Sequence, residues 1–147
     1  MNETNWAKSG ETGLYTVPMV ARILAAKPEK LRSWVEGYGH SHAYPILIRQ
    51  LPRVGGKVIL GFLDLIESAF IRHFLAMGYS PQTIRKVALK LRDRHTADHP
   101  FAMDKRFKAN GRDIFEEVVT DEGEKRLVNL MNDNFEIVPA VEPSLFD

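Results

Sequence analysis

Cations beside short apolar patterns are the residues of this chain best suited to bind a ligand. Two groups stand out in the first part of the chain: Lys27, Lys30 and Arg32 in AKPEKLRSW, and Arg49, Arg53 and Lys57 in RQLPRVGGK. Lysine and arginine on helix surfaces and in turns attract phosphate groups, and phosphate contacts supply much of the affinity of proteins for nucleic acids. The chemistry that these residues predict is the binding of a phosphate-rich partner.

Histidines offer a weaker alternative, a metal site. His40 and His42 lie two residues apart in a glycine-containing stretch, and His95 and His99 flank the expected end of a helix. Neither pair has a cysteine or a defined carboxylate partner in the sequence, so ordinary surface or loop roles are favoured over metal binding.

Catalytic patterns are also weak. Asp64 and Glu67 share one face of an expected helix, but a lone pair of carboxylates there is usually solvated or ion-paired. The chain has no cysteine, and it contains no Walker loop, G-x-G-x-x-G loop, nucleophile elbow or H-E-x-x-H helix. We therefore expect no catalytic residue, no metal, no cofactor and no enzymatic activity.

Composition fits a folded protein with an uneven charge distribution. The 147 residues are 44% hydrophobic and 27% charged, which suits one domain or two small ones. Residues 1–112 carry 18 Lys and Arg against 9 Asp and Glu, whereas residues 113–147 carry 2 against 10. The basic part is suited to phosphate and the acidic end should face elsewhere, although a solvated surface with chance asymmetry is the alternative. No secretory signal or membrane span of roughly 18 apolar residues is visible, so we expect a cytoplasmic location without membrane contact.

Helix signals place the first group of cations on a pair of short helices. Thr16 can cap the first helix, with Pro18 in its first turn and an inward face that comprises Val17, Val20, Ala21 and Leu24. After a break at residues 25–27, Pro28 starts a second helix with the inward stripe Leu31, Trp34 and Val35, which ends at Gly37 and Gly39. Trp34 could stack on DNA, but its spacing favours the core.

The second group of cations surrounds a turn. Gly55-Gly56 lies between two short extended runs in residues 44–62, which is a hairpin signal because glycine tolerates positive φ.

Two longer helices are expected next. Residues 62–77 carry an apolar stripe at steps of three and four, which comprises Leu63, Ile66, Phe70, Phe74 and Met77, and Gly78 ends this helix. Ser80 and Pro81 start the next helix, with Ile84, Val87, Ala88 and Leu91 inward. Its cations are expected outside: Arg85, Lys86, Lys90, Arg92 and Arg94.

The last third of the chain predicts mixed structure. Asn110-Gly111 predicts a hairpin with a type I′ turn, and the spacing of Leu127, Leu130 and Met131 predicts a short helix within residues 121–132. Residues 135–146 are apolar but interrupted by Pro139 and Pro143, so an extended arm is expected that must pack on the core, on a second subunit or on a partner.

The order of helix, short turn, helix and hairpin is that of a winged helix-turn-helix. YTVPMVARILAAKPEKLRSWVEGY moreover resembles the first half of a MerR-type DNA-binding domain, where a YT-x-x-x-x-A opening leads to a turn and an L/I-R-x-W/Y recognition helix. FLDLIESAFIRHFLAMGYSPQTIRKV is similar to the next two helices of that family, so the resemblance covers roughly residues 14–91. A long dimerisation coiled coil does not follow. The segment DHPFAMDKRFKANGRDIFEEV, together with the RQLPRVGGK wing, looks closest to the DNA-binding domain of VapB-type antitoxins, of which the chain would be a short or shortened member.

The resemblance and the pattern together give one expectation. The fold is mainly α with small β hairpins (α+β): a MerR-like winged helix-turn-helix over residues 14–95, then a hairpin and arm over residues 96–147 for dimerisation or partner binding. The function is sequence-specific binding of double-stranded DNA as a homodimer, in a transcriptional regulator or an antitoxin that regulates its own operon and binds a toxin protein. The expected DNA contacts are Thr16, Lys27, Lys30, Arg32, Ser33, Arg49, Arg53 and Lys57. The alternative is a protein-interaction module in which the apolar arm binds the partner and the helices are only a scaffold.

Overall fold

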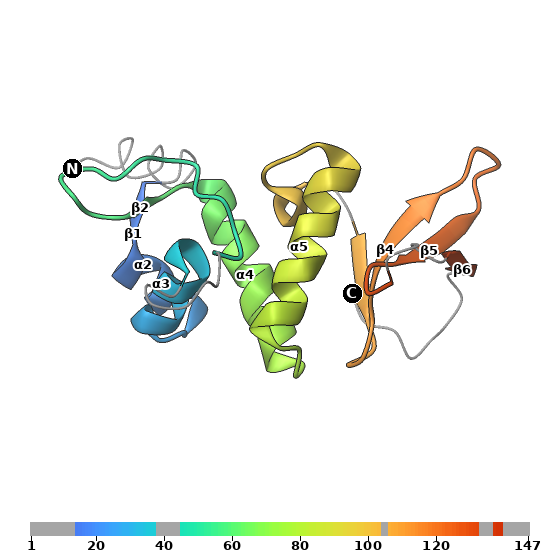
Figure 1. The fold of residues 1–147 in the computed structure, drawn as a ribbon, viewed down its shortest axis with the longest axis horizontal. Helices are drawn as coiled ribbons and strands as arrows, with labels where there is room; N and C mark the ends of the chain where they lie inside the picture. Colours follow the sequence, from blue (N-terminus) through green and yellow to red (C-terminus); the bar gives the residue numbers. More distant parts are fainter. Residues whose placement is uncertain (1–13, 38–44, 104–105, 133–136, 140–147) are drawn as a thin grey trace.

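The computed structural model describes residues 14–37, 45–103, 106–132 and 137–139, with four helices longer than one turn and two small antiparallel sheets among them. The helices are α2 (Val17–Leu24), α3 (Pro28–Glu36), α4 (Phe62–Ala76) and α5 (Pro81–His95), and the 3₁₀ turn η1 spans Pro100–Ala102. The strands are β1 (Tyr15–Thr16), β2 (Ile59–Leu60), β3 (Arg106–Ala109), β4 (Ile114–Val119), β5 (Lys125–Asn129) and β6 (Ile137–Pro139). Figure 1 shows α2 and α3 at one end, α4 and α5 in the middle, and the four-stranded sheet at the other end. The expected α+β class, with helices and small antiparallel sheets, is confirmed.

Helix starts follow the expected capping chemistry. The Thr16 hydroxyl accepts a hydrogen bond from the Met19 N–H at 3.2 Å, and the Ser80 hydroxyl accepts one from the Thr83 N–H at 3.1 Å. A proline lies in the first turn of α2, α3 and α5, where a missing N–H costs no helical hydrogen bond. Ala25 adopts a left-handed conformation with φ of 52°, and this allows α3 to start after only three intervening residues.

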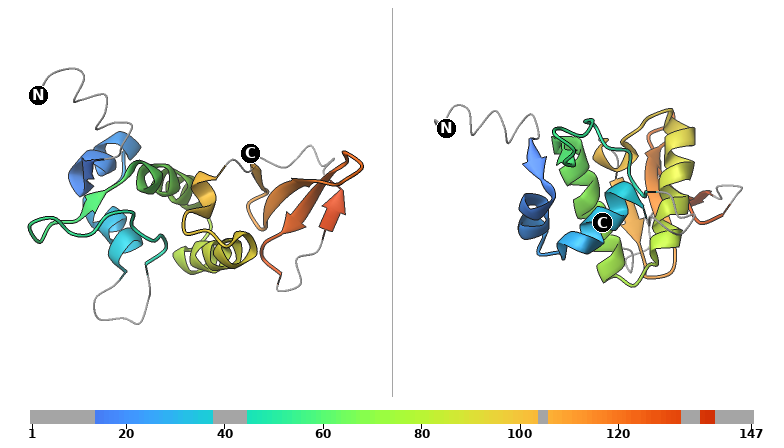
Figure 2. Two further views of the ribbon diagram at one scale, coloured as in Figure 1. Left: turned by 90° about the horizontal axis from the view of Figure 1, so that it is seen from above. Right: turned by 60° about the vertical axis from the view of Figure 1, so that its left-hand side comes forward.

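The Gly55-Gly56 turn is present, but most of the expected hairpin is not. Both glycines have positive φ, and the single bridge of the turn joins Val54 to Lys57. Instead of pairing with the run before the turn, β2 pairs with β1, with Tyr15 opposite Leu60. Because β1 leads directly into α2, this pairing holds the turn segment close to the start of α2, and Figure 2 shows the segment extending at the same end of the molecule.

The second sheet corrects two expectations. β3 and β4 form the expected hairpin, but its loop spans residues 110–113 and Asn110 has no positive φ, so it is not a type I′ turn. The Asn110 side chain instead accepts hydrogen bonds from the N–H groups of Arg112 and Asp113. The expected helix in residues 121–132 is wrong as well, because residues 125–129 form β5 between β4 and β6. Of the apolar arm, only Ile137–Pro139 lies within the described residues, as the extended edge strand β6.

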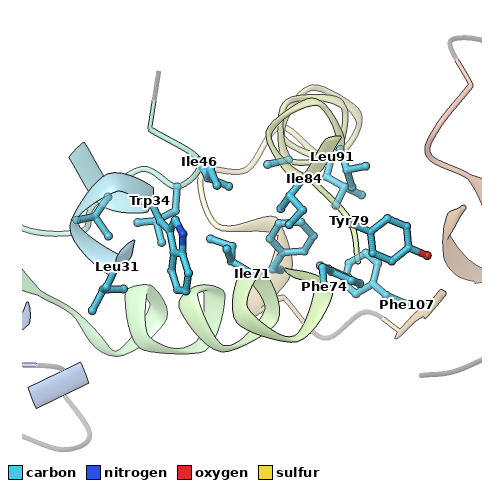
Figure 3. Packing of buried hydrophobic residues seen from close by; sticks show 14 of the residues in the cluster. Leu31, Trp34, Ile46, Ile71, Phe74, Tyr79, Ile84, Leu91 and Phe107 are labelled. Atoms are coloured by element: carbon cyan, nitrogen blue, oxygen red, sulfur yellow. The ribbon is translucent and has the colours of Figure 1, made fainter. Parts of the chain in front are cut away.

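One hydrophobic core runs along α4 and joins the helices to the sheet. Its buried side chains lie in a row from Leu31 and Trp34 at one end to Tyr79 and Phe107 at the other (Figure 3). Trp34 is only 4% exposed, which confirms the core interpretation. Phe70, Phe101 and Phe107 form a triangle of rings with centroids 5.6–5.8 Å apart, which links α4, η1 and β3.

The inward face of α4 differs from the expected stripe. Phe74 is buried as expected, but Leu63, Ile66, Phe70 and Met77 are only partly buried. The fully enclosed side chains of this helix are instead those of Asp64, Glu67, Ser68, Ile71 and Phe74. The helix therefore turns two carboxylates into the protein, which the apolar pattern alone did not indicate.

Candidate nucleic-acid interface

Four of the eight predicted contact residues line one hollow of about 480 Å³ at the end of the molecule that holds α2 and α3. The start of α2 contributes Thr16, α3 contributes Arg32, and the turn after it contributes Arg53 and Lys57. Val17, Pro18, Glu36, Gly56 and Val58 complete the lining. Residues as far apart as Thr16 and Lys57 meet here because β1 pairs with β2.

Glu36 lies among the cations of this hollow. Its carboxylate is 3.9 Å from Arg32 Nε, one helical turn earlier, and it accepts a hydrogen bond from Arg53 Nη2. Arg53 also donates from Nη1 to the main-chain oxygen of Gly56 at 3.1 Å. The side chains of Arg32 and Arg53 are each about half exposed, so both still face solvent. The contacts connect the end of α3 to the turn.

A second basic hollow, of about 490 Å³, lies on the other flank of α3. Lys27, Lys30 and Arg72 supply its charge, and no acidic residue lines it. Apolar groups complete its lining: Ala26, Trp34, Leu75, Ala76 and Pro81. Sequence reasoning missed Arg72, because nothing in the local pattern of α4 indicates that one of its exposed cations lies beside the start of α3.

The two hollows separate cations that are neighbours in the sequence. Lys30 and Arg32 are two residues apart, which is a rotation of about 200° around a helix with 3.6 residues per turn. Because Leu31, Trp34 and Val35 face the core, Lys30 and Arg32 flank the outward side of α3 from opposite edges. The predicted contact residues therefore form two basic edges instead of one patch.

Ser33 and Arg49 do not lie where the prediction placed them. Ser33 is only 9% exposed, and its hydroxyl donates a hydrogen bond to the Lys30 main-chain oxygen at 2.6 Å, so it is no free contact residue. Arg49 precedes the turn and is partly buried, with Nη1 enclosed and without a hydrogen-bond partner among the described residues. Ser33 and Arg49 therefore offer less exposed surface than the other predicted contact residues.

Asp64 and Glu67 were expected to be solvated or ion-paired. Neither is solvated, because neither has any exposed surface, but Glu67 lies 3.4 Å from His99 Nδ1. Asp64 accepts hydrogen bonds from the main-chain N–H groups of Gly61, at 2.7 Å, and Gln50, at 3.2 Å. Glu67 accepts one from the Phe101 N–H at 2.9 Å. Burial raises the pKa of both carboxyl groups, because desolvation disfavours the charged form. Enclosed carboxylates that accept main-chain hydrogen bonds hold separate segments together, which is a structural role.

Two further expectations, that Arg92 lies outside and that His95 and His99 have no carboxylate partner, are wrong. Arg92 is not outside: it is partly buried, it donates to the main-chain oxygen of Ile46, and burial lowers its pKa. His99 Nδ1 lies 3.4 Å from Glu67 Oε1, and His95 Nε2 lies 2.8 Å from the buried Glu116 Oε1. Each of these histidines therefore has a carboxylate partner that the sequence did not reveal.

The described part of the chain contains no group of three or more His, Cys, Asp or Glu side chains that could hold a metal ion, and His40 and His42 lie outside it. None of its helices is long and apolar enough to span a membrane.

Comparisons of the chain with protein families, with curated proteins and with solved structures find no match.

Proposed function

We propose that this protein binds double-stranded DNA in a sequence-dependent manner through α3 and the Gly55-Gly56 turn. The observation that carries the proposal is the convergence of Thr16, Arg32, Arg53 and Lys57 on one hollow beside α3. In fold terms, α2 and α3 would form the helix-turn-helix, and the segment around the turn would be a reduced wing.

The two basic edges of α3 suit a helix that enters a groove. A helix with side chains is about 10–12 Å across, and the major groove of B-DNA is about 12 Å wide, so cations on both flanks of an inserted helix approach opposite phosphate strands. Arg32 and the turn residues Arg53 and Lys57 would meet one strand. Lys27 and Lys30, with Arg72 of α4, would meet the other.

A regulator of transcription is the function class that we propose for this activity. Its more specific form, an antitoxin that represses its own operon and binds a toxin, is supported by the resemblance of residues 14–91 to MerR-type and VapB-type domains. A homodimer fits the same proposal, because a two-fold symmetric protein doubles the small footprint of one helix and one wing.

The test is duplex binding by three double variants that each lose two positive charges. Arg32→Ala with Lys57→Ala alters the first basic edge, and Lys30→Ala with Arg72→Ala alters the second. Lys86→Ala with Lys125→Ala removes two exposed lysines from α5 and β5 as the matched control. Wild-type protein first selects a preferred duplex from a random pool, and affinities are then measured for this duplex and for a scrambled one across a salt series.

Both edge variants are expected to bind more weakly than the control variant. A residue that contacts a base should cost about 1–3 kcal/mol on the selected duplex, whereas one that contacts phosphate should weaken both duplexes and make the salt slope about one unit shallower. Unchanged affinity of the Arg32/Lys57 variant, relative to the control, would contradict the proposal. Binding that ignores salt and duplex sequence would contradict it as well.

A further inference from the structure

Glu36 occupies an unusual place for an acidic residue on a surface suited to phosphate. It is the last residue of α3, and its side chain is only 20% exposed. A negative charge at the C-terminal end of a helix is unfavourable, because the helix dipole places partial negative charge there. The arginines on either side of Glu36 offset that cost, so the carboxylate fits this position only together with its cations.

The contacts of Glu36 resemble those that a nucleic-acid phosphate would make. Arginine binds carboxylate and phosphate with the same planar fork of N–H donors. Arg53 has one terminal nitrogen bonded to Glu36 and the other to the Gly56 main-chain oxygen, while Arg32 Nε lies 3.9 Å from the same carboxylate. A phosphate that approaches Arg32 or Arg53 therefore competes with an internal anion and is also repelled by it.

We propose that Glu36 is a specificity-determining residue, whose carboxylate competes with DNA phosphates for Arg32 and Arg53. This inference rests on the proposed function. DNA of arbitrary sequence is held by phosphate contacts alone, so it gains affinity at Arg32 and Arg53 only by displacing Glu36. A preferred sequence is held by base contacts along α3 as well, and it binds with Glu36 still bonded to Arg53, so it does not lose this displacement energy. Glu36 thereby weakens non-specific binding more than specific binding.

The experiment compares Glu36→Gln with wild type on the selected duplex and on a scrambled duplex of the same length and composition. Glutamine keeps the shape of the side chain and removes its charge. Glu29→Gln is the matched control, because Glu29 is exposed on the first turn of the same helix and its replacement changes the net charge equally. Thermal melting establishes that both variants fold. If Glu36→Gln does not fold, Glu36→Met replaces it in the comparison.

Glu36→Gln should bind the scrambled duplex more tightly than wild type, with a slope of log affinity against log salt that is steeper by about 0.9, as for one additional neutralised phosphate. The ratio of selected to scrambled affinity should fall, while Glu29→Gln should change this ratio little. Equal effects of the two variants would mean that Glu36 acts only through the net charge of the protein, which would overturn the inference. An unchanged ratio of selected to scrambled affinity in Glu36→Gln would overturn it as well, while sequence-dependent binding by wild type would still support the proposed function. If wild-type protein bound neither duplex, the proposed function itself would fail.

Discussion

Glu67 Oε2 on α4 accepts a hydrogen bond from the main-chain N–H of Phe101, across 34 residues of sequence. The carboxylate thereby fixes η1, and with it the ring of Phe101, against α4. Phe101 in turn contacts Phe107 of β3, so one buried acidic side chain stabilises the junction between the helices and the sheet. A buried charge of this kind makes stability depend on pH.

The first prediction concerns Glu67→Gln and the acid range. Burial raises the pKa of Glu67 above its ordinary value of 4.5, so the folded protein binds this proton more tightly than the unfolded chain does. The contribution of the protonated group to stability is complete below pH 4.5 and is lost as the pH rises through the raised pKa. The free energy of unfolding of wild type, minus that of Glu67→Gln, should therefore decrease over this window, by at most about 1.4 kcal/mol per pH unit.

Urea denaturation at a series of pH values measures this difference. Glu122→Gln is the control, because Glu122 is exposed in the turn between β4 and β5 and should show a much flatter difference. A difference that rose with pH for Glu67→Gln would show that the surrounding charges, His99 and Arg92, outweigh desolvation, contrary to the prediction.

The second prediction concerns the hydroxyl of Tyr79. Tyr79 is buried after α4, and its hydroxyl donates to the Asp113 main-chain oxygen at 2.7 Å and accepts from the Gly111 N–H at 2.9 Å. Tyr79→Phe should lower the free energy of unfolding by about 1–3 kcal/mol, since two partly buried main-chain groups lose a partner. Urea denaturation measures the change. A loss of unfolding free energy below about 0.5 kcal/mol, which is the range of ordinary surface substitutions, would contradict this prediction.

Local signals in the sequence were sufficient for the helix starts and for the positions of the turns, but not for the type of turn at Asn110 or the strand pairing around Gly55-Gly56. Thr16, Pro18, Ser80 and Pro81 act within four residues of their own position, so their capping chemistry can be predicted without knowledge of the rest of the fold. Trp34 was correctly assigned to the core for the same reason, because the helical spacing of Leu31, Trp34 and Val35 determines one inward face.

Features that depend on distant partners could not be predicted in this way. The spacing of Leu127, Leu130 and Met131 fits a helix, but strand pairing of residues 125–129 with β4 and β6 overrides it. Asp64 and Glu67 are polar residues whose burial depends on main-chain donors up to 34 residues away, at Gln50 and Phe101.

The candidate site likewise has features that the local sequence determines and features that depend on distant residues. The positions of Lys30 and Arg32 on opposite edges of α3 could be predicted from the sequence, because the angle between two residues of a helix follows from its 3.6 residues per turn. Arg72 enters the second edge only through the packing of α4 against α3, and the partners of Glu36 include a residue of the turn 17 positions later.

The third prediction separates helix capping from DNA binding at Thr16. Its hydroxyl caps α2, and the residue also lines the first basic hollow. Thr16→Ala should lower the free energy of unfolding by about 1 kcal/mol without any DNA present, whereas Thr16→Ser should retain stability because serine caps equally well. Thermal or urea unfolding of the two variants gives the comparison. Equal stability of Thr16→Ala and Thr16→Ser would mean that the cap contributes nothing measurable.

The fourth prediction is a two-fold homodimer that pairs through an edge of the second sheet. β3 and β6 are the two edges of this sheet, and an unpaired strand edge is a template for pairing with another chain. We expect β3 of one subunit to pair with β3 of the other, since the Asn110 loop leaves that hairpin well ordered by its own hydrogen bonds.

Sedimentation over a concentration series should show a dimer at high micromolar concentration, and hydrogen exchange should identify the edge that forms it. Protection of amides in Arg106–Ala109 should increase with protein concentration, while the amides of Ile137 and Val138 should exchange at a constant rate. A monomer at all concentrations would contradict the dimer, and a concentration effect confined to β6 would assign it to the opposite edge.

Because a dimeric protein would bind two half-sites about 34–36 Å apart, the duplex selected by the wild-type protein should contain an inverted repeat at this spacing or a multiple of it. A selected sequence without internal symmetry, bound by a protein that sediments as a dimer, would mean that the dimer forms through a surface that does not align two copies of α3.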